Sequence, residues 1–272
     1  MTSNFAKTFL IAALAALVPL SAQAHRTWLL PSATVLDGKE PWVTFDAAVS
    51  EDLFDFDTNA QKLDVLEVLG PDGAAVKPEN AFTGRLRSSF DLKLAKPGTY
   101  KVSMVREGAM VSYKVGGELK RWRGDEKDMA KEIPANAEDV QVTRQHARQE
   151  TYVTAGKTSD AVLKKQSGVG IELVALTHPN ELFAGETARF RLLLDGKPLA
   201  NHLFGIVPGG VRYRGVLNEI AISTDAKGEF SVKWPAAGMY WLNASWPARG
   251  DGPPVMVPRR VSYSVTLEVL PQ

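Results

Sequence analysis

The chain has 272 residues, with 32 lysine and arginine residues against 31 aspartate and glutamate residues, and it contains no cysteine. A charge balance this even argues against nucleic acid as a partner, because binding to a phosphate backbone requires an excess of basic residues. The lack of cysteine excludes disulfides, thiolate metal sites and cysteine nucleophiles. Any metal site must therefore use histidine, carboxylate, methionine or backbone groups.

The N-terminus has the pattern of a secretory signal peptide. An apolar run ends at Leu20, and Ala22 and Ala24 then fit the small-residue rule for signal peptidase. The run is short for a membrane anchor, and no later segment is apolar for long enough to cross a bilayer. The sequence therefore predicts that residues 1–24 are removed and that the mature protein begins at His25 in the periplasm, with no span left in the membrane.

Short strands with one buried face are expected throughout residues 25–118. Val43, Phe45 and Ala47 alternate with polar neighbours, which is typical of a half-buried strand. Turn signals such as Gly70-Pro71-Asp72-Gly73 separate this strand from others like it. The segment is predicted to form an N-terminal β-sandwich.

Residues 119–167 differ from their surroundings, because they are rich in charge and poor in large apolar side chains. A short helix is expected within residues 124–132, stopped by Pro134. Residues 140–153 are expected to form a strand that closes the first sandwich, and a polar linker follows.

Alternation returns in residues 168–272, where six strands are separated by turns such as Asp195-Gly196-Lys197-Pro198. The sequence thus predicts an all-β protein: two Ig-like or prealbumin-like β-sandwich domains joined by a polar, partly helical segment. Because a polar linker precedes residue 168, we expect the C-terminal sandwich to fold alone.

Several segments resemble the DUF4198 family. The segment Ala24–Pro31 is similar to its opening "AH-x-x-W-L-x-P", and Glu172–Pro179 to its "E-L-V-x-L-x-x-P" segment. Three further matches are the "V-T-x-G-K", "DGKPL" and "TDAxG" motifs at residues 152–157, 194–199 and 224–228. The resemblance extends over nearly all of the mature chain. It implies a periplasmic protein associated with nickel or cobalt uptake, with an envelope transporter or receptor as its partner.

His25 is the strongest candidate for a metal ligand. After cleavage it carries a free α-amino group beside its imidazole, and the two can chelate Cu(II), Ni(II) or Zn(II). The α-amino pKa is near 8, so the metal competes with a single proton at neutral pH. We therefore expect a divalent transition metal (nickel, cobalt or copper) as the ligand. The alternative is that a histidine follows the cleavage site by coincidence.

A tight site needs at least one more ligand, and the chain has only three other histidines: His146, His178 and His202. His178 is the predicted partner of His25, because it stands at the end of a strand, where loops carry function. His146 would share a cationic face with Arg144 and Arg148, which suits an anion better than a metal. The acidic segment 45–57 is a local source of oxygen ligands, namely Asp46, Glu51, Asp52, Asp55 and Asp57.

No catalytic motif is present, neither G-x-S-x-G, H-E-x-x-H, a P-loop nor G-x-G-x-x-G, so we expect a protein that is not an enzyme. Two alternatives remain open. One is a non-catalytic interaction or carbohydrate-binding module of the envelope. The other is a copper histidine-brace oxidase, which needs a second histidine beside His25. Trp234, Trp241 and Trp246 would suit a sugar platform, although aromatic residues on alternating strands usually pack in the core.

Overall fold

The structure is a computed structural model that describes residues 25–248 and 257–272. The signal peptide predicted for residues 1–24 lies outside the described residues. Strands are the dominant secondary structure of the described chain, which confirms the all-β prediction. Its helical elements are a 3-10 turn, η1 (Glu126–Asp128), and two single-turn helices, α1 (Met129–Glu132) and α2 (Val211–Arg214). No helix in these residues is both long and apolar enough to span a membrane.

The first sheet belongs to the N-terminal sandwich and has the order β1-β3-β7-β6, with β4 paired to β3. Its strands are β1 (Arg26–Pro31), β3 (Trp42–Ser50), β4 (Asn59–Ala60), β6 (Glu79–Thr83) and β7 (Ser88–Lys93). Buried and less buried residues alternate along β3 and β7, as the sequence predicts for strands with one face in a core.

The central sheet has nine strands and follows the order β15-β14-β17-β18-β10-β8-β5, with β2 paired to β10 and β9 to β8. Its strands are β2 (Val35–Leu36), β5 (Leu66–Leu69), β8 (Gly98–Val115), β9 (Glu118–Gly124), β10 (Glu138–Ala155), β14 (Leu203–Pro208), β15 (Ile220–Ser223), β17 (Gly238–Trp246) and β18 (Arg259–Val269). β10 pairs antiparallel with β8 and parallel with β18. The strand predicted to close the first sandwich therefore belongs to both sandwiches.

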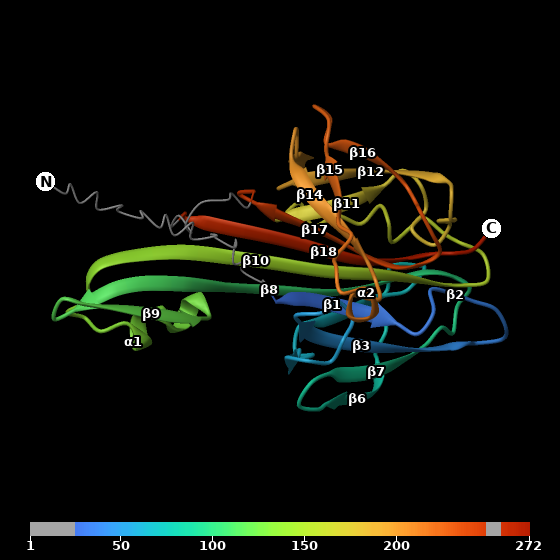
Figure 1. Ribbon diagram of the computed structural model, residues 1–272. Coiled ribbons are helices and arrows are strands. Elements are labelled where there is room, and N and C mark those ends of the chain that lie inside the picture. The colour runs from blue at the N-terminus through green and yellow to red at the C-terminus, as the bar shows by residue number, and fades with distance from the viewer. Residues whose placement is uncertain (1–24, 249–256) are drawn as a thin grey trace, which may run out of the picture.

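The third sheet completes the C-terminal sandwich. It has the order β11-β12-β13, with β16 paired to β12. Its strands are β11 (Ile171–Ala175), β12 (Thr187–Leu194), β13 (Lys197–Pro198) and β16 (Glu229–Lys233). Figure 1 shows the central sheet running across the molecule, with β1, β3 and β7 on one side and β11, β12 and β16 on the other.

The central sheet thus contributes a different face to each core. Val153 and Ala155 of β10 pack with the first sheet, whereas Tyr152 packs with the third sheet. Because side chains alternate along a strand, the odd-numbered positions of β10 face the first sheet and the even-numbered positions face the third. The last eight residues of β10 are buried on both faces, although many of them are polar.

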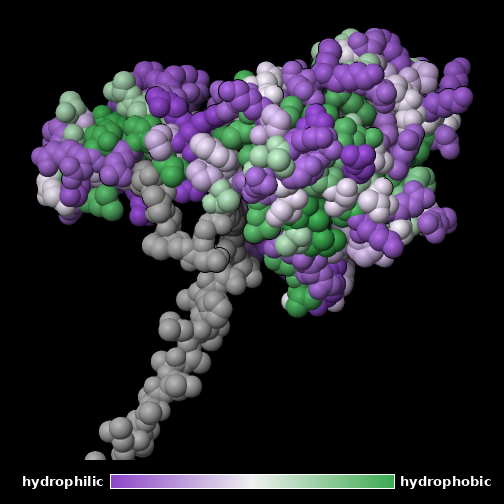
Figure 2. Space-filling view, turned by 90° about the horizontal axis from the view of Figure 1, so that it is seen from above, coloured by the Kyte–Doolittle hydropathy of each residue, from purple (hydrophilic) through white to green (hydrophobic). Residues whose placement is uncertain are grey.

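The outer parts of β8 and β10 extend beyond both cores and, together with β9, η1 and α1, form a projecting arm (Figure 1). In the space-filling view the arm is a separate lobe whose visible face has polar side chains around an apolar patch (Figure 2). The helix predicted within residues 124–132 occurs here as η1 and α1.

Candidate functional site

His25 lies immediately before β1, and its side chain faces the acidic loop after β3. In the β1–β3 ladder, Arg26 is opposite Ser50, so the next pair outward brings His25 to Glu51. The His25 Nε2 atom is 3.7 Å from Glu51 Oε1, and more than half of each side chain is exposed. Glu51, Asp52, Asp57 and Thr58 line an open cavity of about 640 Å³ beside this pair.

Asp57 organises this loop. Its carboxylate accepts hydrogen bonds from the Glu51 and Asp52 amides (3.0 and 2.9 Å) and from the Thr58 hydroxyl (2.8 Å). Burial acts to raise the pKa of Asp57, but these hydrogen bonds outweigh it, so the pKa is lowered overall. The loop therefore holds an ionised carboxylate whose oxygens are already engaged.

The remaining acids of segment 45–57 are divided between other partners and solvent. Asp46 accepts a hydrogen bond from Ser89 and lies 3.6 Å from Arg87. Burial raises the pKa of Asp55, which lies 3.9 Å from an Arg212 nitrogen. The Asp52 carboxylate makes no hydrogen bond or ion pair with any residue in the described part of the chain. Glu51 and Asp52 are therefore the carboxylates of this segment that remain available beside His25.

Both ring nitrogens of His178 are already engaged. Nε2 lies 3.1 Å from the Thr99 hydroxyl, and Nδ1 accepts a hydrogen bond from the Asn180 amide at 3.1 Å. Burial lowers the pKa of His178, which keeps the ring neutral at pH 7. These contacts tie the loop after β11 to β8.

The structure does not bring the two predicted ligands, His25 and His178, together. The Thr99 partner of His178 also bonds Thr154, which is on the face of the central sheet that carries the third sheet. β1 packs on the opposite face. Thr154 pairs with β2, which follows β1 in the chain. His25 precedes β1, so it lies at the opposite end of this strand from Thr154. The central sheet separates the two side chains.

The other two histidines, His146 and His202, are buried and do not lie beside His25. His146 Nδ1 lies 3.2 Å from a Glu107 oxygen, and its ring packs against Gly170. Burial lowers the pKa of His202, a buried residue just before β14. Among residues 25–248 and 257–272, no three histidine, aspartate or glutamate side chains are grouped so as to hold a metal ion.

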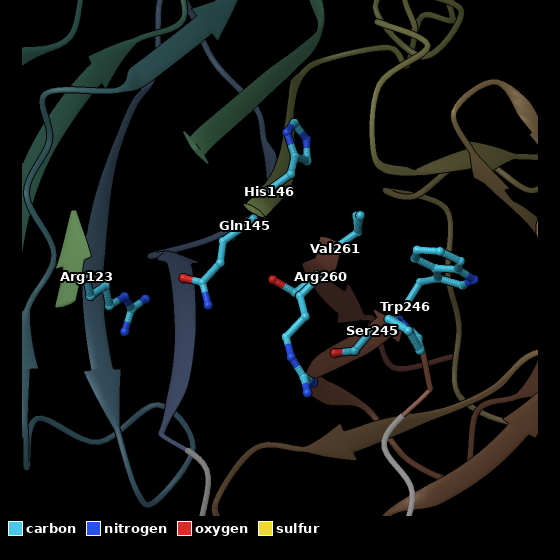
Figure 3. Close-up of a pocket in the computed structure, with 10 residues that line it drawn as sticks. Arg123, Gln145, His146, Ser245, Trp246, Arg260 and Val261 are labelled. Carbon is cyan, nitrogen blue, oxygen red and sulfur yellow. The ribbon is translucent and has the colours of Figure 1, made fainter. Parts of the chain in front are cut away.

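A second cavity lies on the face of the central sheet that the first sheet leaves open. It has a volume of about 220 Å³ and lies where β10, β17 and β18 run side by side, with Arg123 contributed by β9. Figure 3 shows Arg123, Gln145, Ser245 and Arg260 directed to the same side, whereas the His146 and Trp246 rings point away from them. We call the side chains of Arg123, Gln145, Ser245, Arg260 and Ser262 the basic pocket.

The sequence does not reveal this pocket, because its residues come from strands whose pairing no local pattern predicts. The sequence analysis places a cationic face on Arg144, His146 and Arg148, the even positions of β10. Arg148 is buried in a network of charges, and Arg144 pairs with Glu126 at 2.7 Å. The pocket uses the odd position Gln145, which is opposite Arg260 in the ladder.

The tryptophans do not form a sugar platform. Trp234 and Trp241 are buried in the cores, and the Trp241 indole donates to the Thr27 carbonyl at 3.0 Å. Trp246 is about one-third exposed, at the end of β17.

The fold and these two surfaces define an all-β sandwich protein with a histidine–carboxylate pair at its N-terminal strand and a cationic pocket on its central sheet. The sequence model for the family described as "Domain of unknown function (DUF4198)" matches residues 22–248. The chain belongs to this family. No curated protein matches the sequence.

Solved structures with some similarity include a DUF4785 family protein from Legionella pneumophila, at 10% identity and a TM-score of 0.24, covering 79% of this chain and 50% of that one. The D0-D1 domain of intimin is 14% identical with a TM-score of 0.21, covering 88% of this chain and 96% of that one. Trypsin-activated alpha-2-macroglobulin from Escherichia coli is 12% identical with a TM-score of 0.22, covering 89% of this chain and 16% of that one.

This chain therefore spans half the length of the Legionella protein and a smaller part of the macroglobulin. At scores this low, the β-sandwich assignment rests on the chain's own sheets.

Proposed function

We propose that the protein is an exported, periplasmic accessory protein without catalytic activity that binds one nickel, cobalt or copper ion at His25 after residues 1–24 are removed. The observation that carries the proposal is the pairing of the exposed His25 ring with the Glu51 carboxylate at 3.7 Å. Imidazole and amine nitrogens together with a carboxylate oxygen form a donor set that suits these ions.

The α-amino group would supply the ligand that the side chains lack. Of the two ring nitrogens, Nδ1 is nearer to the backbone, so Nδ1 and the amine can bind the same ion. Nε2 then points away from the metal, and in this structure Nε2 is the nitrogen that faces Glu51. A carboxylate that accepts the outer N–H of a metal-bound histidine fixes the ring tautomer and raises the basicity of the ligand.

Asp52 is the nearest candidate for an additional oxygen ligand. It lines the same open cavity as Glu51, and Asp57 keeps the loop in place through the amides of both residues. The oxidase alternative needs a second imidazole beside His25. The chain has four histidines, and the other three have buried rings or engaged nitrogens. This placement favours binding without catalysis.

The test is a metal titration of protein whose first residue is His25. We expect one equivalent of Cu(II) or Ni(II) to bind, with a rise in melting temperature of about 5 to 10 °C at a hundredfold excess over the dissociation constant. His25→Ala should abolish the shift. Glu51→Gln should weaken binding about tenfold or more, because it replaces the charged acceptor of the ring N–H by a neutral amide oxygen.

Two controls separate this site from others. An added N-terminal methionine keeps the imidazole but converts the His25 amine into an amide, so it should weaken binding, whereas His25→Ala abolishes it. His178→Ala should leave the affinity unchanged, because His178 lies across the central sheet. Retention of binding in His25→Ala would place the metal elsewhere. An exported protein that begins at another residue would remove the basis of the proposal.

A further inference from the structure

The strand β15 forms a free edge of the central sheet. It pairs with β14 on one side and is the last strand of the sheet on the other (Figure 1). A free edge presents unpaired backbone N–H and C=O groups, which are a template for pairing with another strand. Natural proteins usually protect such edges with charged residues, proline or a covering segment.

Other edges of the described sheets carry protection of this kind. In the first sheet, the edge strand β6 contains Glu79 and an irregularity in its pairing with β7. In the third sheet, β13 consists of Lys197 and Pro198, and β16 carries Glu229 and Lys233. The sequence of β15 is Ile-Ala-Ile-Ser, with neither charge nor proline. This edge is therefore open to a partner strand.

The hydrogen-bond pattern indicates which residues of β15 face outward. The Thr224 amide, just after the strand, donates a hydrogen bond of 3.0 Å to the segment that leads into β14. Because the direction of bonding alternates along an antiparallel strand, Ile220 and Ile222 also direct their backbone groups to β14. Ala221 and Ser223 direct theirs to the free edge, where no described residue pairs with them.

The side chains of β15 are divided between the two faces of the sheet. Ile220 and Ile222 are partly buried against the core of the C-terminal sandwich. Ala221 and Ser223 are exposed on the other face. The edge thus has apolar surface that is still uncovered on one face and small side chains on the other, so a second strand can approach closely.

We propose that β15 pairs with β15 of a second copy of this chain, in an antiparallel, two-fold symmetric arrangement that continues the central sheet through both copies. The pair is centred on Ala221, which lies opposite itself and exchanges both backbone hydrogen bonds with its counterpart. Ile220 of each copy is then opposite Ile222 of the other, and Glu219 is opposite Ser223. The proposal is independent of the metal site.

The edge is self-complementary in this register, which is what a two-fold interface requires. The isoleucine pairs join the apolar surface of both copies, and Glu219 has no acid opposite it. Centring the pair on Ile222 instead would set Glu219 opposite Asp225, and like charges directly opposite each other are unfavourable. Pairing of two short strands buries little area, so we expect a weak dimer.

The experiment is sedimentation equilibrium of the chain that begins at His25, from micromolar to millimolar concentration. We expect a reversible equilibrium between monomer and dimer with no larger species, because pairing occupies the free edge of both copies. Amide exchange measured by NMR should slow at Ala221 and Ser223 as the concentration rises. The amides of Ile220 and Ile222 face β14 and should change little.

Substitutions at Ala221 test the register. Ala221→Lys and Ala221→Glu each place a charge opposite itself, so each variant should stay monomeric where the natural chain dimerises. An equimolar mixture of the two variants should regain the dimer, because opposite charges then face each other. Ala81→Lys is the matched control: it makes the same change at an exposed alanine of another edge strand, β6, and should leave the dimer unchanged.

Several results would overturn the proposal. A natural chain that stays monomeric at millimolar concentration would do so. A dimer that survives both Ala221→Lys and Ala221→Glu would have its interface elsewhere, and species that grow beyond a dimer would exclude the two-fold pairing. Equal weakening by Ala81→Lys and Ala221→Lys would indicate an effect of overall charge. Failure of the mixed variants to dimerise would contradict the pairing of Ala221 with itself.

Discussion

At the residue scale, the side chain of Glu150 has no exposed surface and lies on the face of the central sheet that carries the third sheet, among two cations and two phenols. One carboxylate oxygen is 2.7 Å from Lys101 Nζ and 3.5 Å from an Arg148 nitrogen. The other accepts hydrogen bonds from Tyr152 at 3.0 Å and Tyr263 at 2.8 Å. Burial acts to raise the pKa of Glu150, but the Lys101 charge and hydrogen bond outweigh it and lower the pKa.

The two tyrosines complete this arrangement as neutral donors. Burial, reinforced by the negative charge of Glu150, raises the pKa of Tyr152 and of Tyr263 well above the usual value. Glu150 therefore stays ionised while every lone pair that it presents to the network has a donor. A buried ion pair satisfied in this way is costly to break on one side, because the remaining charge stays buried.

We predict that Glu150→Gln lowers the free energy of unfolding by about 3 to 5 kcal/mol, because it leaves Lys101 and Arg148 without their main counter-charge. Urea denaturation followed by circular dichroism measures the change. Glu138→Gln, at an exposed position of the same strand, should change stability by less than about 0.5 kcal/mol. A loss of under about 1 kcal/mol in Glu150→Gln would mean that the network is hydrated or relaxes.

The sequence predicts the burial of apolar side chains well and the burial of charged side chains poorly, for a physical reason. The alternation of Val43, Phe45 and Ala47 predicts one buried face, and all three are buried. The same logic makes Lys101, Arg148 and Glu150 appear solvent-exposed, because buried charge is rare unless it is paired. Lys101 and Tyr263 reach Glu150 from other strands, so only the folded chain reveals that these charges are buried and paired.

At the element scale, β8 and β10 have two different environments along their length. Near Gly98 and Ala155 they are buried on both faces, whereas their outer parts form the arm with β9. The sequence predicts the existence of these strands but not the arm. It assigns the charged segment 119–167 to an insertion with a closing strand and a linker, and this segment supplies β10 and all but the first residue of β9.

The base of the arm depends on a close backbone approach at Gly108. A Cβ atom at this position would lie 2.8 Å from the Gly124 carbonyl oxygen, which is closer than such atoms come in proteins. Gly124 begins the β8–β9 ladder through its pairing with Ala109. The contact is with backbone, so the β9 strand itself must move if a side chain is added.

We predict that Gly108→Ala loosens β9 without unfolding the body. Hydrogen exchange should show lower amide protection in residues 118–124, while the melting temperature falls by less than about 4 °C, because the arm lies outside the three hydrophobic clusters. Ser112→Ala, farther out on β8, adds no new contact and should leave protection unchanged. A large drop in melting temperature would show that the arm and the body unfold together.

At the scale of the whole molecule, the two sandwiches share one sheet. The sequence predicts two sandwich units on either side of a polar segment, and both sandwiches are present. It does not predict that β10 lies between them, because parallel pairing with β18 joins residues far apart in the chain. The same pairing explains the basic pocket, whose floor needs the register of β10, β17 and β18. The N-terminal site differs from the basic pocket in this respect. The sequence already singles out His25 and the acidic segment 45–57, and the structure adds only the pairing between them.

The shared sheet bears on whether the C-terminal sandwich folds alone, as the sequence predicts. A fragment of residues 168–272 keeps the third sheet and β14 to β18 but loses β10. It thereby loses the ladder of eight residue pairs with β18, the Tyr152 side chain in its core and the Glu150 acceptor of Tyr263. The exposed β18 edge would be a long strand with unpaired backbone groups, which favours aggregation.

We therefore predict that fragment 168–272 shows no cooperative unfolding, whereas the full mature chain unfolds in one transition with coincident fluorescence and circular dichroism curves. Fragment 138–272 is the matched comparison, because it restores β10 with Glu150 and Tyr152 while still lacking β8. It should regain part of the cooperativity, although Glu150 then lacks Lys101. If fragment 168–272 unfolds cooperatively with a stability close to that of the full chain, β10 adds little to the second core, and the autonomy expected from the sequence holds.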